Sequence, residues 1–146
     1  MQIRLMQLED YSQVYQLWLS CKGMGLNDLD DSQEGIERYL KRNPETCFVA
    51  QEEERIVGVI LSGHDGRRGY IHHTAVHPDH RGKGIGTALV EQAMAALERC
   101  GIHKAALVVF KRNQTGNDFW ERRGFTDRED LVYRNRAIRD LKRIDT

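Results

Sequence analysis

The sequence lacks several features that would place it in a special class of protein. It contains no apolar run near the length that spans a bilayer, and its first residues, Met1 to Leu5, lack the apolar core of a signal peptide. The three cysteines, Cys21, Cys47 and Cys100, are odd in number and far apart, which is typical of reduced thiols and not of a disulfide framework. We therefore expect a cytoplasmic protein that does not enter a membrane.

Neither sign of charge is in excess. The chain has 146 residues, and its 22 lysines and arginines balance 22 aspartates and glutamates. Proteins that bind the backbone of nucleic acids usually carry a basic excess, so the composition argues against a nucleic-acid partner. There are only two prolines, no internal repeat and no low-complexity segment. We expect residues 1–146 to form a single domain, with residues 136–146 as a loosely ordered tail.

The spacing of apolar residues predicts helices and strands along the chain. The expected helices cover residues 11–22, residues 32–42 with a stop at Asn43-Pro44, residues 85–100 and residues 113–123. The expected strands cover residues 2–7, 47–50, 56–61, 70–76 and 105–110, with one or two closing strands in residues 125–134. Because residues 105–110 are continuously apolar and rich in valine, we expect a central strand that is buried on both faces.

The order of these elements predicts an α/β fold with one mixed sheet. Residues 47–50 and 56–61 are separated by a short polar turn, which favours an antiparallel hairpin. The strand at 70–76 is followed by a long helix and then by the strand at 105–110, which is a β-α-β crossover between parallel strands. We therefore expect a mostly antiparallel sheet with one parallel crossover and with helices on both faces.

One glycine-rich stretch, from Val76 to Thr87, joins the strand at 70–76 to the long helix. A strand, a bend and then free backbone N–H groups at a helix N-terminus form a typical phosphate site. A P-loop is excluded because no Lys-Ser/Thr pair follows the last glycine. A dinucleotide-binding loop is excluded because it needs the spacing G-x-G-x-x-G, whereas this stretch has G-x-G-x-G. The residues Arg81-Gly82-Lys83-Gly84-Ile85-Gly86 instead fit an Arg-x-x-Gly-x-Gly pattern.

This stretch resembles the acetyl-CoA-binding motif of the GNAT superfamily of N-acetyltransferases, including the lead-in Ala75-Val76-His77-Pro78. Residues 119–125, Phe-Trp-Glu-Arg-Arg-Gly-Phe, resemble a later segment of that family, and the order of elements agrees along nearly the whole chain. The resemblance implies the family's fold, acetyl-CoA as cosubstrate and direct transfer of the acetyl group to an amine. It also implies that residues 1–146 form one N-acetyltransferase domain.

The glycines predict how the pyrophosphate of acetyl-CoA would be bound. Glycine at positions 82, 84 and 86 keeps side chains away from the inward-facing N–H groups of residues 81–86, Ile85 included. Arg81 and Lys83 add positive charge, and Thr87 adds a hydroxyl group. The resemblance implies that Thr74, Ala75 and Val76 bind the pantetheine arm and the thioester oxygen through their backbone. Asn113 either contacts that arm or caps a helix, and Trp120 packs against the coenzyme or the core.

The acid and base of the reaction are predicted less directly. Strand alternation places His72 and His73 on opposite faces, and either one is a candidate general base because histidine titrates near neutral pH. The family often has tyrosine where this chain has Trp120, and an indole cannot protonate a thiolate. Either Tyr133 or another tyrosine supplies the acid, or the thiolate leaves without one. Five of the six histidines lie between residues 64 and 80, but their spacing matches no zinc pattern, so we expect no metal.

The sequence leaves the acceptor open. Specificity should lie in the connection at residues 23–31, its flanking helices and the closing strands. Asp28, Asp30, Asp31 and Glu34 could attract a cationic amine, or could form a solvated acidic loop. The acceptor could be a small-molecule amine or a protein N-terminus, and the chain a monomer or a homodimer. The alternative to an enzyme is a non-catalytic sensor module that binds acyl-CoA.

Overall fold

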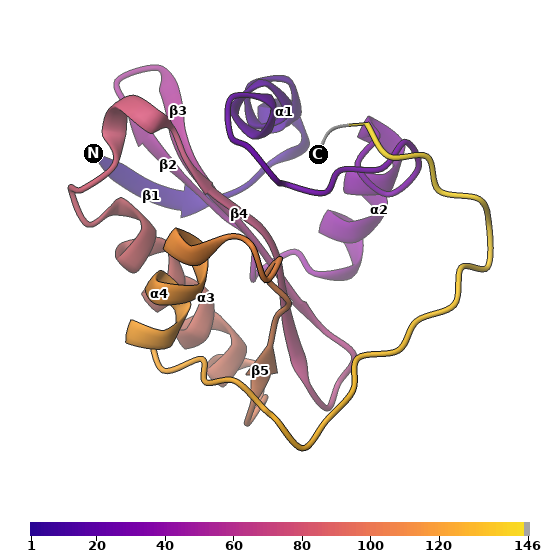
Figure 1. Cartoon of the computed structure of the whole chain (residues 1–146). Coiled ribbons are helices and arrows are strands. Elements are labelled where there is room, and N and C mark those ends of the chain that lie inside the picture. The colour runs from indigo at the N-terminus through magenta and orange to yellow at the C-terminus, as the bar shows by residue number, and fades with distance from the viewer. Residues whose placement is uncertain (145–146) are drawn as a thin grey trace.

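The computed structural model describes residues 1–144, and the five strands within them form one sheet in the order β1-β2-β3-β4-β5 (Figure 1). Neighbouring strands are antiparallel except for β4 and β5, which are parallel. The predicted mixed sheet with one β-α-β crossover is therefore confirmed. The strands are β1 (Gln2–Leu5), β2 (Phe48–Glu52), β3 (Arg55–His64), β4 (Gly69–Val76) and β5 (Ala105–Ala106).

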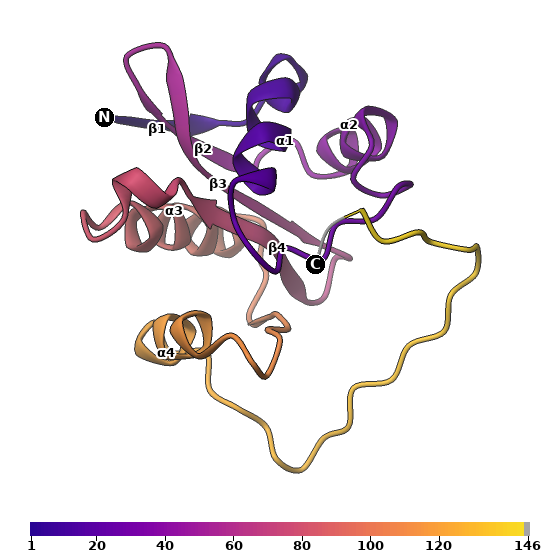
Figure 2. The same cartoon turned by 45° about the horizontal axis from the view of Figure 1, so that its top comes forward.

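Helices cover both faces of the sheet, as the sequence predicts (Figures 1 and 2). On one face lie α1 (Tyr11–Leu19) and α2 (Gln33–Arg42); α3 (Ile85–Arg99) and α4 (Gln114–Arg122) lie on the other. Two short 3-10 helices, η1 (Leu8–Asp10) and η2 (Pro78–His80), lead into the helical segments. Each face has its own core cluster, one centred on Trp18 and Val59 and the other on Leu89 and Ile60.

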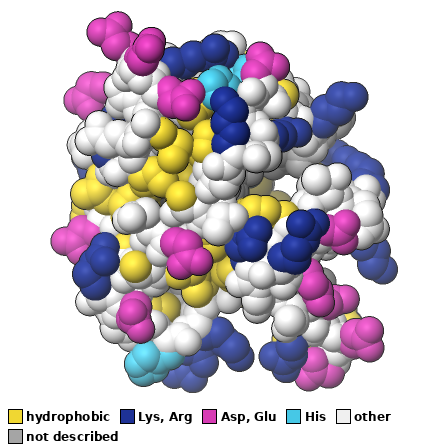
Figure 3. All heavy atoms as spheres, turned by 90° about the vertical axis from the view of Figure 1, so that its left-hand side faces the viewer, with side chains coloured by type: hydrophobic (Ala, Val, Ile, Leu, Met, Phe, Trp, Pro, Cys, Tyr) yellow, Lys and Arg dark blue, Asp and Glu magenta, His cyan; other side chains and the backbone are white. Residues whose placement is uncertain are grey.

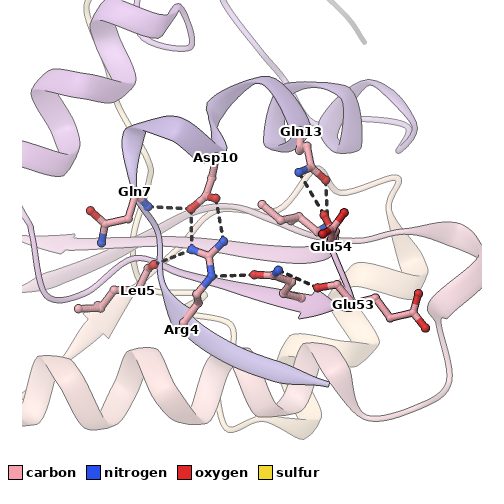
Figure 4. A network of polar contacts seen from close by, with 9 residues as sticks. Arg4, Leu5, Gln7, Asp10, Gln13, Glu53 and Glu54 are labelled. Atoms are coloured by element: carbon pink, nitrogen blue, oxygen red, sulfur yellow. Dashed lines mark hydrogen bonds and ion pairs between the residues drawn. The ribbon is translucent and has the colours of Figure 1, made fainter.

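Local signals explain where the helices begin and end. Ser32 caps α2 by accepting a hydrogen bond from the N–H of Gly35 at 3.0 Å. In α3 the buried side chains recur at helical spacing, and Gly101, with φ of 80°, ends the helix. At the other end of the chain, the Arg4 guanidinium donates to both carboxylate oxygens of Asp10 at 2.8 Å, which ties β1 to the start of α1 (Figure 4).

The prediction of a central strand at residues 105–110 is wrong. Only Ala105 and Ala106 pair with β4, and β5 is the last strand at the edge of the sheet. The side chain of Val108 is 58% exposed. A continuous apolar run predicts burial on both faces only if neighbouring elements cover it. Here no described strand lies on the outer side of β5, so the run remains partly open.

The predicted closing strands at residues 125–134 are also absent. The chain after α4 is extended and mostly exposed, and it passes around the molecule towards α2 without joining the sheet (Figures 1 and 2). Its end is held by the connection before α2, because Asp28 donates its N–H to the carbonyl of Lys142 and Ile144 donates to the carbonyl of Leu26. The predicted tail at 136–146 is thus attached near its end; residues 145–146 lie outside the described part.

A β-bulge interrupts β4 and changes which way its side chains point. Val59 pairs with Ala75 and Leu61 pairs with His72, so His73 and Thr74 together stand opposite one residue of β3. His73 has φ of 29°, a backbone conformation that is rare for a residue with a side chain. Ile71 and Ala75 consequently belong to core clusters on opposite faces. The predicted strict alternation, with His72 and His73 on opposite faces, is wrong.

The surface carries both signs of charge. On the face shown in Figure 3, basic and acidic side chains are interspersed around exposed apolar side chains. This distribution agrees with the formal net charge of zero.

Candidate active site

The loop between β4 and α3 has the backbone shape that an anion site needs. Gly82 and Gly84 have φ of 78° and 81°, and a Cβ atom at either position would meet nothing within 4 Å. The two glycines are therefore required by backbone conformation, and they leave open space in front of the loop. Gly84 is also the N-cap of α3 and provides no side-chain cap. The first N–H groups of α3 are thus left available to an anion.

Gly86 has a different role from its two neighbours in the motif. A Cβ atom on Gly86 would lie 3.2 Å from the ring of Phe119 and 3.7 Å from Val76. The absence of a side chain at this position lets α4 pack closely on the start of α3. The sequence explained all three glycines by access to N–H groups, whereas the structure adds close helix packing as a reason for the third.

The cations of the loop point in different directions. Arg81 is turned back, because its Nε donates to the carbonyl of Val76 at 3.1 Å and its Nη2 lies 3.5 Å from the sulfur of Cys21. Its guanidinium therefore helps to hold the end of β4. Lys83 is exposed and makes no ion pair with any described residue. The positive charge of Lys83 is therefore available to an anion in front of the loop, whereas the Arg81 guanidinium lies against the end of β4.

Beyond its first residues, the outer edge of β4 is free. β5 pairs only with Gly69 and Tyr70, and the chain after Ala106 is no longer paired with β4. The edge from Ile71 to Val76 therefore has no partner strand within residues 1–144. This edge holds Thr74, Ala75 and Val76, and it ends at the glycine loop, so the structure brings these two predicted coenzyme-binding segments together.

His73 is held firmly on the α1 and α2 side of the sheet. Its Nε2 lies 2.9 Å from Oδ1 of Asp31, a carboxylate that is 3% exposed and also accepts the N–H of Asn27 at 2.8 Å. The indole of Trp18 donates to the carbonyl of His73 at 3.1 Å. The ring and the backbone of His73 are therefore both held in place, the ring by Asp31 and the backbone by Trp18.

His72 lies beside His73 on the same side, between two tyrosines. Its ring centroid is 4.6 Å from that of Tyr70 and 5.6 Å from that of Tyr39. Desolvation lowers the pKa of His72 below its usual 6.5, and the neighbouring His73 lowers it further, against a smaller opposite effect of the nearby aspartates. The imidazole of His72 is therefore neutral at pH 7 and able to accept a proton.

Both histidines line one cavity of about 410 Å³ between α2, β4 and the connection before α2. The other walls carry charged and aromatic side chains, namely Asp30, Asp31, Arg38, Tyr39 and Arg42. Of these, the sequence identified only the two aspartates. The arginines could have been noticed from their spacing of four residues, which puts them on one side of a helix.

The remaining predicted site residues lie elsewhere. Asn113 caps α4, since its side chain accepts the N–H of Gly116 at 2.9 Å. Trp120 packs edge-on between Phe119 and Phe125, against the core under α3. Tyr133 is 67% exposed in the extended segment and does not line the cavity. Within residues 1–144, no three histidine, cysteine or acidic side chains are grouped so that they could hold a metal ion.

Comparison with known proteins identifies the family. Residues 11–125 match the model of the Acetyltransferase (GNAT) family. An acetyltransferase of Yersinia pestis (strain Pestoides F) is 32% identical over 140 residues, which cover 96% of this chain and 98% of that protein. The chain therefore belongs to the GNAT family of acetyltransferases.

Solved structures share the fold. Ard1 from Thermoplasma volcanium superposes with a TM-score of 0.76 at 21% identity, covering 86% of this chain and 82% of that one. Rv2747 from Mycobacterium tuberculosis, in complex with CoA and NLQ, has a TM-score of 0.71 at 22% identity, with 88% and 74% covered. No helix in residues 1–144 combines the length and the apolar character needed to cross a membrane.

Proposed function

We propose that this chain is an N-acetyltransferase that transfers the acetyl group of acetyl-CoA directly to a primary amine. One observation carries the proposal: a neutral histidine lines a cavity at the bulge of β4, and the free edge of the same strand leads to the glycine loop. Acetyl-CoA bound along that edge would have its thioester beside the cavity. Family membership supports the donor, and residues 1–146 are proposed to act as one catalytic domain.

The backbone would bind the donor. The free N–H groups at the start of α3 suit the pyrophosphate, and the open space at Gly82 and Gly84 leaves room for it. The pantetheine arm would lie against Thr74 and Ala75. The carbonyl of Val76 is already bonded to Arg81, so Val76 would contribute its N–H rather than its carbonyl. A backbone N–H beside the bulge would stabilise the negative charge that develops on the thioester oxygen.

The cavity would hold the amine and receive its proton. The amine nitrogen attacks the thioester carbon, the N–C bond forms, the C–S bond breaks, and coenzyme A leaves as a thiolate. His72 takes the proton that the amine loses, while Asp31 and His73 fix the neighbouring wall. Because a thiol has a pKa of about 8.5, the thiolate can leave without a dedicated acid. Tyr133, exposed and outside the cavity, is not needed in this scheme.

The test is acetyl transfer with purified protein. The protein is incubated with acetyl-CoA and a panel of free amino acids, polyamines, aminoglycosides and peptides. Release of coenzyme A and formation of N-acetylated product are both measured. We expect at least one class to give product in a one-to-one ratio with coenzyme A. If acetyl-CoA binds and no class is acetylated, the chain is a coenzyme sensor and the proposed activity is wrong.

A further inference from the structure

Two arginines of α2, both exposed, lie on the wall of the cavity. Arg38 and Arg42 are one helical turn apart and both line the cavity. Within residues 1–144 neither forms an ion pair or a side-chain hydrogen bond, whereas Glu37 and Lys41 on the same helix pair at 3.5 Å. Both side chains are exposed, so either guanidinium can turn towards an anion that enters the cavity.

The opposite end of the cavity is acidic. Asp31 is bonded to His73, and Asp30 accepts a hydrogen bond from the side chain of Asn27 at 3.1 Å. The cavity thus has two carboxylates at the end where α2 begins and two guanidinium groups farther along α2. The two carboxylates and the two guanidinium groups carry equal and opposite formal charge. A ligand with one positive and one negative group matches such a cavity, whereas a polyamine would bring positive groups towards the arginines.

We propose that the acceptor is a small amine that also carries a carboxylate, such as a free amino acid. The amine would lie at the acidic end beside His72, and the carboxylate would be bound by Arg38 and Arg42, whose planar groups suit it. A volume of about 410 Å³ is ample for a molecule of this size. A protein N-terminus is less suitable, because its nearest carboxyl group is already converted to an amide. This inference rests on the proposed acetyl transfer at the same cavity.

The experiment compares acceptors that differ only in the negative group. Initial rates are measured for a series of free amino acids, the corresponding amino-acid amides, the decarboxylated amines and the aminophosphonates, for the native protein and the double variant Arg38→Gln/Arg42→Gln. We expect kcat/KM for the acids to exceed that for the amides by about 10-fold or more, as for a hydrogen-bonded charged group. The double variant should lose this preference, because its KM for the acids should rise.

A matched control separates the arginines of the cavity from arginines in general. Arg99 is an exposed arginine in the last turn of α3, as Arg42 is in the last turn of α2. The variant Arg99→Gln should keep the native preference, and Arg42→Gln should lose part of it. Equal rates for acids, amides and decarboxylated amines in the native protein would overturn the inference. An unchanged preference in the double variant would also overturn it. A preference for phosphonates over carboxylates would overturn it as well and would assign the arginines to phosphate.

Binding measurements distinguish the failure of this inference from failure of the proposed function. Titration calorimetry with coenzyme A present measures the affinity of the most active amino acid and of its amide without any turnover; if none is active, L-alanine and L-alaninamide are used. If no amine is acetylated but the acid binds and the double variant does not bind it, acetyl transfer is wrong and the carboxylate site stands. If amines are acetylated without a carboxylate preference, the transferase stands and this inference is wrong.

Discussion

At the scale of single residues, the bulge in β4 decides which side of the sheet His72 and His73 occupy. A regular strand would turn His72 and His73 to opposite faces, as the sequence predicts. The extra residue at the bulge brings both to the same cavity, where His73 is bonded to Asp31 and the His72 ring forms no side-chain hydrogen bond with any residue of 1–144. No sequence pattern marks this bulge, since histidine and threonine are ordinary strand residues. The two candidates could therefore be named from the sequence, but their division of roles could not.

The first prediction concerns His72. Replacing it with glutamine removes the proton acceptor and should lower kcat by about 10²- to 10⁴-fold, the usual contribution of a general base. Since only neutral imidazole accepts a proton and the pKa of His72 lies below 6.5, the native rate should be constant near pH 7 and fall as the pH drops through that pKa. The pH profile of kcat/KM should lose this acidic limb in His72→Gln.

The control for this experiment is His103→Gln, which changes an exposed histidine in the connection between α3 and β5. This variant should keep both the native rate and the acidic limb. An unchanged limb in His72→Gln would show that another group takes the proton, and His73→Gln would then be measured in the same way.

At the scale of elements, long periodic segments were predicted well and edges were not. The helical spacing of Leu89, Ala93 and Leu97 identified α3 within a residue or so of its ends, because one face of the helix must be buried. The run at 105–110 has an equally clear apolar signal, yet only two residues pair with β4. Pairing of an edge strand depends on a partner from elsewhere in the chain, which local composition does not report.

The glycine loop is an element whose role can be tested by adding bulk. Gly84→Trp fills the space in front of the start of α3 and forces a side chain into a left-handed conformation. We expect it to weaken acetyl-CoA binding by at least about 10-fold, because donor and side chain would occupy the same place. Calorimetric titration with coenzyme A measures the change directly.

Gly66→Trp is the matched control for the loop. Gly66 lies in the turn between β3 and β4, has φ of 89° and, like Gly84, has open space around it. Backbone strain should be similar in the two variants, so a difference in affinity reports on the loop itself. If the two variants bind coenzyme A equally well, the pyrophosphate does not lie at the start of α3.

At the scale of the whole molecule, the fold class and the glycine loop between β4 and α3 could be predicted from the sequence, and the cavity that lies beside β4 could not. The donor loop is one continuous segment with a specific spacing of glycines. The cavity is assembled from α2, β4 and the connection at residues 25–31, which meet only in the folded chain. The same limit explains residues 125–134, where closing strands were expected but Leu131 and Val132 are exposed and no strand forms.

The arrangement of the whole site also favours direct transfer of the acetyl group over transfer through an acetylated enzyme. None of the three cysteines lines the cavity, and burial raises the pKa of the Cys47 thiol to about 12. In the proposed arrangement, the donor would lie along the edge of β4 and the acceptor would lie in the cavity. Both can therefore be bound at once, which direct transfer requires.

The most direct test of this account is the initial rate measured against acetyl-CoA concentration at several fixed concentrations of an active acceptor amine. Direct transfer within a complex of both substrates predicts double-reciprocal plots that intersect. Parallel plots would show that the enzyme itself carries the acetyl group between two half-reactions, and they would contradict the central claim.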